Sequence, residues 1–216
     1  MNDLLNFDTN KIKKIHLLWI VAMLVFLPSC LNTQSIYPEK QYYLLETTQA
    51  PIPEKITSRE VLRIAKLRMS PAYTGKGFIY KKNETTYDTD FYNEFLVSPD
   101  DMLAEIIRKW FGLTGMFARV TCSSGHYKEK YILEGAVTAL HGDYSDRKNP
   151  RAVLDIQFFL IEDNGLSYSL ILQKNYSKAL VIDKHKTHSL VKGWSSALTE
   201  ILSDFQAEIS KKIKKK

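Results

Sequence analysis

Cys30 is the residue of this 216-residue chain whose type and position are best suited to chemistry. Its thiol follows an N-terminal segment that is first basic, with Lys11, Lys13 and Lys14, and then apolar without interruption over residues 17–27. An apolar run of this length is typical of the core of a secretory signal peptide, whereas a helix that crosses a bilayer needs about 20 apolar residues. A thiol placed directly behind such a segment is a candidate for covalent attachment of lipid.

The residues around Cys30 resemble the lipobox of bacterial lipoproteins. Leu27 stands at position −3, Ser29 at −1 and the cysteine at +1, while Pro28 is a less usual occupant of −2. The resemblance implies that residues 1–29 are removed and that Cys30 becomes the lipidated first residue of the mature protein. Two other interpretations remain open. One is a buried hydrophobic helix with an incidental cysteine, and the other is an uncleaved membrane anchor, which Pro28 and the short apolar run disfavour.

Two further groups of residues could in principle carry catalysis or bind a metal. Cys122 and His126 lie four residues apart in a polar loop, but a Cys/His nucleophile pair needs support in space that a sequence does not show. His185 and His188 lie in the segment DKHKTH; zinc needs three or four ligands, so a solvated loop before a helix is the simpler interpretation. The sequence contains no glycine-rich phosphate loop. We therefore expect a protein that is not an enzyme, with no catalytic residue, no cofactor and no metal site.

The positive charge of the chain is concentrated at its two ends. The formal net charge is +6, from 30 basic and 24 acidic residues. Without residues 1–29, the remaining 187 residues carry 27 basic and 22 acidic residues, and five of the basic ones are Lys211, Lys212 and Lys214–Lys216. The domain between the leader and the terminal lysines therefore carries equal numbers of basic and acidic residues. Nucleic-acid binding, in contrast, requires Lys and Arg gathered on a folded surface. We expect no nucleic-acid partner, and the terminal lysines either contact anionic headgroups or are simply solvated.

The chain after Cys30 is predicted to fold as a single α+β domain. Its length suffices for a hydrophobic core, and contents of 44% hydrophobic and 12% aromatic residues are typical of a folded chain. Runs of strands followed by helices indicate a mixed, largely antiparallel sheet with two main helices packed on one face. Strands are expected over about 41–47, 60–69, 77–96 and 116–121, and in a meander of long strands that begins near Tyr131.

Two amphipathic helices are predicted. The first spans 99–111, where Ser98 can cap the helix, Pro99 suits the first helical position and Gly112 is a suitable stop. The second spans about 188–211, and its apolar stripe is expected to pack on the sheet; a detached helix that binds a partner is the alternative. The stripe consists of Val191, Trp194, Leu198, Ile201, Leu202, Phe205 and Ile209.

The turn at 163–165 offers a test of strand register. We predict a three-residue loop with Gly165 in the left-handed conformation, because this register keeps apolar residues together and pairs Phe158 with Leu170. A slip of one residue would turn every side chain of the strand to the other face of the sheet.

Several segments recur in one known family. They are YYLL at 42–45, the block FIYKKNETTYDTDFYNEFLVSPDDMLAEIIRKWF at 78–111, with its Tyr92, and LEG at 133–135. Together with the lipobox and the apolar last helix, they make residues 30–210 similar to the ABC-type transport auxiliary lipoprotein family. That family includes the lipoprotein components of paraquat-inducible and related mammalian-cell-entry-type lipid transporters.

The resemblance implies an outer-membrane lipoprotein, lipid-anchored and facing the periplasm, that acts as a non-catalytic auxiliary subunit of intermembrane lipid transport. Its expected partner is a periplasmic mammalian-cell-entry-type transporter subunit. Leu31 rather than Asp follows the lipidated cysteine, which in lipoprotein families accompanies release to the outer membrane. Self-association into a homo-oligomer is a further expectation, because rings of subunits invite symmetric partners. The alternative function is that of an outer-membrane assembly lipoprotein that plugs or chaperones a barrel protein.

The expected organisation of the chain therefore has four parts. They are a lipoprotein signal peptide over 1–29, a lipidated tether over 30–40, the auxiliary lipoprotein domain over 41–210 and a Lys-rich tail over 211–216.

Overall fold

The structure is a computed structural model, and it describes residues 13–14, 16–19, 38–53, 58–122, 128–183 and 186–213. The chain divides into two compact units, Met1–Pro38 and Glu39–Lys216. In the first unit, residues 13–14 and 16–19 are helical. Cys30 and most of the expected signal peptide lie outside the described residues.

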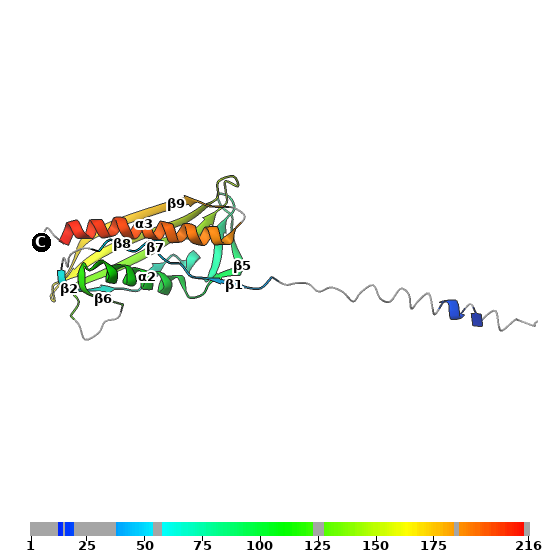
Figure 1. Cartoon of the computed structure of the whole chain (residues 1–216), viewed down its shortest axis with the longest axis horizontal. Helices are drawn as coiled ribbons and strands as arrows, with labels where there is room; N and C mark the ends of the chain where they lie inside the picture. The colour runs from blue at the N-terminus through cyan, green and yellow to red at the C-terminus, as the bar shows by residue number, and fades with distance from the viewer. Residues whose placement is uncertain are drawn as a thin grey trace, which may run out of the picture. The chain divides into compact units, whose positions relative to one another are not determined.

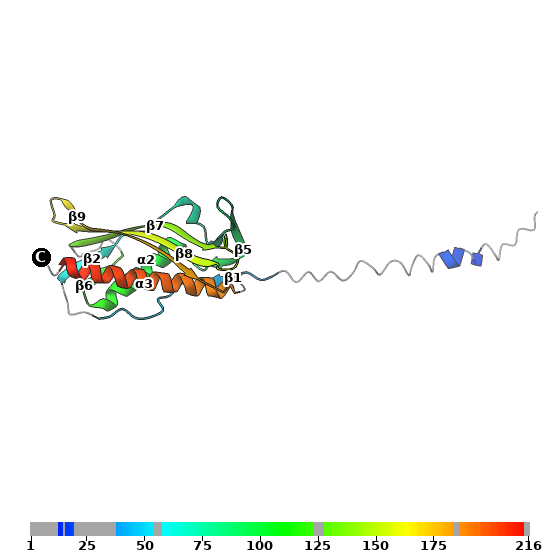
Figure 2. The same ribbon diagram turned by 90° about the horizontal axis from the view of Figure 1, so that it is seen from above.

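The second unit is an α+β domain in which α2 and α3 cover one face of a large sheet (Figures 1 and 2). Its strands are β1 (Gln41–Tyr43), β2 (Ser58–Ile64), β3 (Arg68–Met69), β4 (Gly77–Lys81), β5 (Tyr87–Phe95), β6 (Phe117–Thr121), β7 (Tyr131–Asp143), β8 (Arg151–Asp163) and β9 (Tyr168–Val181). Its helices are the short 3₁₀ helix η2 (Pro71–Tyr73), α2 (Pro99–Thr114) and α3 (Thr187–Ile213).

The nine-stranded sheet is mixed, and β7 lies at its centre. β7 pairs in parallel with the shorter strands β2, β3 and β4, and in an antiparallel manner with β8. The two longest ladders, β7–β8 and β8–β9, are both antiparallel. The predicted fold class, a largely antiparallel mixed sheet with two main helices on one face, is therefore confirmed.

The core lies between the sheet and the two helices. Alternate residues of β8, among them Leu154, Ile156 and Phe158, are completely buried on the face that the helices cover. The ring of Phe158 stacks on that of Phe205 in α3 with centroids 4.5 Å apart. All seven residues of the predicted α3 stripe are buried, so the prediction that this stripe packs on the sheet is confirmed.

Helix α2 begins as predicted and ends later than predicted. Pro99 occupies the first helical turn, but the Ser98 hydroxyl donates to Asp101 Oδ2 at 2.6 Å instead of accepting a bond from the backbone. Gly112 does not stop the helix, which continues to Thr114 and ends at Gly115, whose φ of 70° is left-handed. A glycine stops a helix only where the chain turns into the left-handed conformation, and here that residue is Gly115.

The register of the β8–β9 hairpin differs from the prediction. Gly165 has the predicted left-handed conformation, with a φ of 82°, but the strands are joined by residues 164–167, and Phe158 pairs with Lys174 instead of Leu170. This register places Lys174 beside the charged side of α3, where its ammonium lies 3.3 Å from Glu208. The loop is followed by a register shift between Ile161, which faces Leu170, and Leu160, which faces Leu172. The shift restores the pairing of even-numbered with even-numbered residues, so apolar pairs such as Leu160 with Leu172 are kept.

Helix α3 also runs beyond its predicted end. Lys211 and Lys212 belong to the helix and Ile213 is buried, so the first part of the expected Lys-rich tail is helical. Residues 214–216 lie outside the described residues.

Candidate functional site

An extended segment that follows β1 runs between α2 and α3; we call residues 44–53 the strap. Leu45 and Pro51 of the strap are buried, and the amide of Leu45 donates to Met102 Sδ of α2 at 3.3 Å. On the other side, the amides of Glu46 and Thr48 donate to hydroxyls of α3. The strap therefore belongs to the helical layer of the domain, although it has no regular secondary structure.

Three buried polar residues of α3 hold the strap. Ser195 Oγ accepts from the amide of Glu46 at 3.3 Å, and Thr199 Oγ1 accepts from the amide of Thr48 at 2.9 Å. Further along α3, Gln206 Nε2 donates to the carbonyl of Ile52 at 2.8 Å. These bonds satisfy backbone groups that would otherwise carry a desolvation penalty, and they fix the strap's path along the helix.

Gln206 also connects the strap to α2. Its Oε1 accepts a hydrogen bond from Trp110 Nε1 at 3.1 Å, so one buried amide joins α2, α3 and the strap. The oxygen and the nitrogen of this buried side-chain amide are both hydrogen-bonded, so the amide can move little without losing a bond. Gln206 therefore fixes the relative positions of these three segments.

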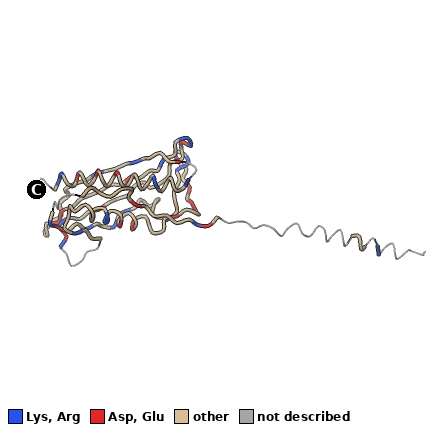
Figure 3. Tube along the Cα trace, viewed as in Figure 1, with Lys and Arg blue, Asp and Glu red and all other residues tan. Residues whose placement is uncertain are grey.

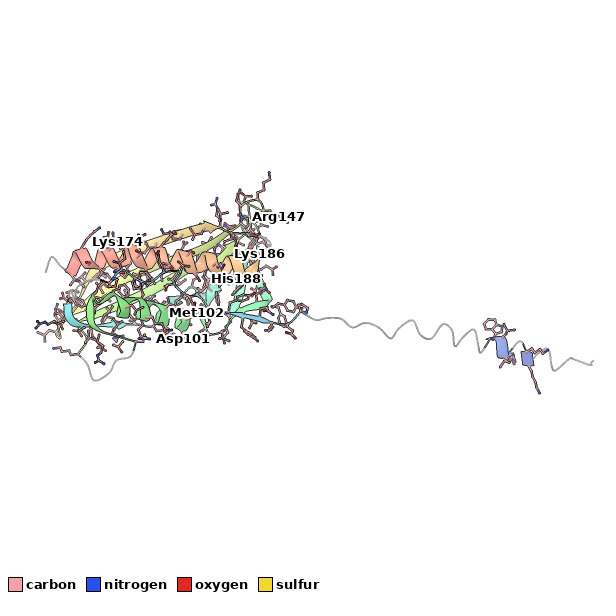
Figure 4. All side chains as sticks on the ribbon, viewed as in Figure 1. Asp101, Met102, Arg147, Lys174, Lys186 and His188 are labelled. Atoms are coloured by element: carbon pink, nitrogen blue, oxygen red, sulfur yellow. The ribbon has the colours of Figure 1, made fainter. Side chains whose placement is uncertain are left out.

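An open groove of about 690 Å³ lies between the strap and α2. Its apolar lining is formed by Leu44 from the strap and by Met102, Ile106, Trp110 and Leu113 from α2. Figure 4 labels Met102 near the first turns of the helix. Leu44 and Leu113 are 46% and 64% exposed, so the groove presents apolar surface to solvent while its walls are fixed from within.

Two charged side chains of α2, Glu105 and Lys109, line this groove, and Arg108 pairs with the first of them. The guanidinium of Arg108 donates to both carboxylate oxygens of Glu105 at 2.6 and 2.7 Å and holds the pKa of that carboxyl below its usual range. Lys109 Nζ lies 3.8 Å from the same carboxylate. Glu105 is therefore an ionised, paired group at neutral pH, which suits orientation of a partner better than proton transfer.

Charges of both signs alternate over the rest of the domain (Figure 3). Many are paired, as where Lys178 of β9 lies 2.8 Å from Glu200 and 3.7 Å from Asp204 of α3. Basic and acidic positions are therefore interspersed along the described part of the Cα trace.

The cysteines and histidines that the sequence analysis considered for catalysis or metal binding are not brought together in the described part of the chain. Cys122 is exposed at the end of β6, and desolvation raises the pKa of its thiol against an opposing effect of Arg108. His188 is exposed in the first turn of α3, near Lys186 (Figure 4). Cys30, His126 and His185 lie outside the described residues. Among the described residues, no three His, Cys, Asp or Glu side chains are grouped so that they could hold a metal ion.

The comparisons with known proteins concern the fold. A protein from Xanthomonas campestris described by the family model DUF330 has 15% identity and a TM-score of 0.68, with 79% of this chain and 95% of that chain covered. A second solved structure, of an uncharacterised protein, has 19% identity and a TM-score of 0.58, with 81% of this chain and 99% of that one covered. The PelC dodecamer from Paraburkholderia phytofirmans is more distant, with 15% identity, a TM-score of 0.43, and 73% and 93% covered.

The first two likenesses show a shared fold. No family model matches the sequence, and no curated protein sequence matches it. Among the described residues, no helix is both long and apolar enough to span a bilayer.

Proposed function

We propose that this protein is an outer-membrane lipoprotein, anchored through Cys30 and facing the periplasm, and that it serves as an auxiliary docking subunit of a mammalian-cell-entry-type intermembrane lipid transport system. In this role the protein binds and positions other subunits and performs no chemistry of its own. The sequence resemblance over residues 30–210 and the α+β fold support this assignment.

The anchor is physically sufficient for a stable membrane attachment. Each buried CH₂ of an acyl chain contributes about 0.8 kcal/mol, so that two or more chains hold a protein firmly on a bilayer. A subunit fixed in this way needs a preformed surface for its partner more than it needs a catalytic centre.

The observation that carries the docking role is the groove between the strap and α2. Its apolar floor is open to solvent, and its walls are fixed by the hydrogen bonds of Ser195, Thr199 and Gln206. A surface that is already ordered loses little conformational entropy on binding. The charges of Glu105 and Lys109 in its lining, with Arg108 paired to Glu105, supply orientation.

The experiment is photocrosslinking in the native cell. Leu113, which lines the groove, is replaced by p-benzoylphenylalanine, and Leu166, which is 100% exposed in the β8–β9 turn, carries the same group as a control. We expect the Leu113 derivative to capture a periplasmic mammalian-cell-entry-type subunit and the Leu166 derivative to capture far less of it. Capture of a barrel protein instead would support the assembly role and contradict the proposal, as would equal yields from the two positions.

A further inference from the structure

Strand β5 contains a long, irregular bulge beside β1. Its pairing with β4 changes between Ile79, which faces Thr89, and Gly77, which faces Glu94. Residues 90–93 of β5 therefore lie opposite Phe78 alone. A bulge of this kind bends its strand and redirects side chains that regular alternation would place on opposite faces.

The carboxylate of Asp90 organises the bulge. It accepts hydrogen bonds from the Tyr80 hydroxyl at 2.7 Å, from the amides of Tyr92 and Asn93 at 2.8 and 3.0 Å, and from Asn93 Nδ2 at 2.7 Å. Partial burial alone would raise the pKa of Asp90, but these bonds together hold it below its usual value. The chain also passes too close for a side chain at Gly77, where a Cβ would lie 2.8 Å from the carbonyl oxygen of Asp90.

What this rigid bulge presents to solvent is a pair of aromatic rings. Phe91 is 67% exposed and Tyr92 is 37% exposed, and their rings meet edge to face with centroids 5.3 Å apart. Lys40 Nζ lies 4.5 Å from the centroid of Phe91 and 2.6 Å from a carboxylate oxygen of Glu94. Exposed aromatic rings with this much supporting structure are not explained by core packing.

Further apolar side chains continue this surface along β1. Tyr42 pairs with Glu94 in parallel register, and the amide of Leu96 donates to the carbonyl of Tyr43 at 2.9 Å, which aligns the segments after both strands. We define the aromatic patch as five exposed residues of these two neighbouring segments. They are Tyr42, Phe91, Tyr92, Leu96 and Val97, with exposed fractions between 37% and 67%.

Cations accompany the patch. Besides Lys40, the exposed Lys76 donates to the carbonyl of Leu96 at 3.1 Å. Arg147 and Lys186, both exposed, lie at the same end of the domain as β1 (Figures 1 and 4). Aromatic rings beside Lys and Arg are the composition that proteins place at the headgroup level of membranes.

The short stretch of chain between Cys30 and β1 favours the membrane as the binding partner of this surface. Ten residues, 31–40, separate Cys30 from the start of β1. Even fully extended, they reach at most about 35 Å. When Cys30 is acylated, this tether keeps β1, and the part of β5 that pairs with it, within about 35 Å of the membrane.

We infer that the aromatic patch rests on the phospholipid surface that holds the anchor, with Phe91 and Tyr92 at the boundary between headgroups and acyl chains. This inference depends on the anchored state in the proposed function. The lipid attachment then sets where the domain is, and the patch sets its orientation, so that the opposite end of the domain points away from the bilayer.

The test uses the lipidated protein purified from its cell and reconstituted in vesicles of phosphatidylethanolamine and phosphatidylglycerol. A tryptophan is introduced by Phe91→Trp, by Tyr42→Trp in a second variant, and by Leu166→Trp as the control in the β8–β9 turn. That turn lies at the end of the domain opposite to β1 (Figure 2). Lipids brominated close to the headgroup quench indole rings that lie about 5–10 Å deep in the interface.

We expect brominated vesicles to remove most of the added fluorescence of the Phe91→Trp and Tyr42→Trp variants and to leave that of Leu166→Trp nearly unchanged. Flotation of the same vesicles measures the anchor separately. Protein that floats with all three tryptophans unquenched would overturn the membrane contact and leave the anchored function standing, and crosslinks between copies at position 91 would then assign the patch to self-association. Protein that does not float would contradict the anchor and the inference with it.

Discussion

His141 is held in a closed aromatic environment on β7. It is 6% exposed, its ring stacks on that of Tyr73 at 5.8 Å, and the Tyr87 ring meets it edge-on at 5.7 Å. Its Nδ1 lies 3.2 Å from the Tyr73 hydroxyl. Burial, with a contribution from Lys81, lowers the pKa of His141 although Asp143 and Asp155 oppose the shift. The imidazole is therefore neutral at pH 7.

This lowered pKa predicts an acid-sensitive fold. The unfolded chain takes up a proton at histidine near pH 6.5, while the folded protein resists protonation, so the free energy of unfolding must fall as the pH decreases from about 6.5 toward the lowered pKa. Urea denaturation at pH 7.5 and 5.5 measures the loss. We expect His141→Gln, which has no titrating group, to lose less stability than the wild type over this interval.

Tyr73→Phe is the matched control for this measurement. It removes the hydroxyl that lies beside the imidazole, which should lower the stability by about 1 kcal/mol, but it keeps the buried ring that desolvates His141. Its pH dependence should therefore follow the wild type. Equal losses in the wild type and in His141→Gln would show that the acid sensitivity comes from other groups.

At the scale of elements, alanine at the two glycines near the end of α2 should change the stability of the protein in opposite directions. Gly112 lies inside the helix, and a Cβ there would meet nothing within 4 Å, so Gly112→Ala should stabilise the protein by about 0.5–1 kcal/mol. Gly115 ends the helix with a φ of 70°, and Gly115→Ala should destabilise it by about 1–2 kcal/mol. Thermal or urea unfolding measures both. Two changes of the same sign would contradict the observed helix end.

The strap gives a second prediction at this scale. Thr199→Val removes the hydroxyl that accepts from the amide of Thr48, which then lacks its partner, and we expect a loss of about 1–2 kcal/mol. Hydrogen exchange at the Thr48 amide should become faster. Ser203→Ala, at an exposed position of α3, is the control and should change stability by less than about 0.5 kcal/mol. Unchanged exchange at Thr48 in the valine variant would show that the strap is held by other contacts.

The elements also show what sequence patterns can and cannot predict. The α3 stripe was predictable because its apolar residues recur with the helical period, and so was the left-handed Gly165. Residues 44–47 of the strap were predicted to continue the first strand, which ends at Tyr43. The path of the strap could not be predicted, because it depends on polar residues of α3 that lie far away in the sequence. The one available signal was the presence of Ser195, Thr199 and Gln206 next to the apolar stripe.

Register and bulges escaped prediction for a related reason. The β8–β9 pairing contains a register shift between Leu160 and Ile161, which the turn residues 163–165 alone do not predict. The bulge at Asp90 interrupts the two-residue period that strand prediction assumes. The exposure of Phe91 could not be inferred from the sequence, because it depends on the bulge.

For the whole molecule, the proposed anchor predicts a direction for α3 relative to the membrane. The helix starts at the same end of the domain as β1 and ends at the other (Figure 1). Its 27 residues span about 40 Å at 1.5 Å per residue. If the end near β1 faces the bilayer, Lys211 and Lys212 point away from it, which argues against contact between these lysines and headgroups of the anchoring membrane.

Exchange of these lysines tests that orientation. Lys211→Gln together with Lys212→Gln should leave unchanged both the flotation of the lipidated protein and the quenching of the Phe91→Trp probe. Because surface attraction to anionic lipid contributes about 1 kcal/mol per Lys near the membrane, a contact would be readily detected. Weaker flotation or altered quenching in the double variant would place this end of α3 at the membrane.

The most direct test of the account is the mass of the protein isolated from its native cell. We expect a chain that begins at Cys30, without residues 1–29, and that carries acyl chains on this residue, whereas Cys30→Ala should keep its leader and carry no lipid. A native protein with an intact leader and an unmodified thiol at Cys30 would contradict the membrane anchor, and with it the proposed role in lipid transport.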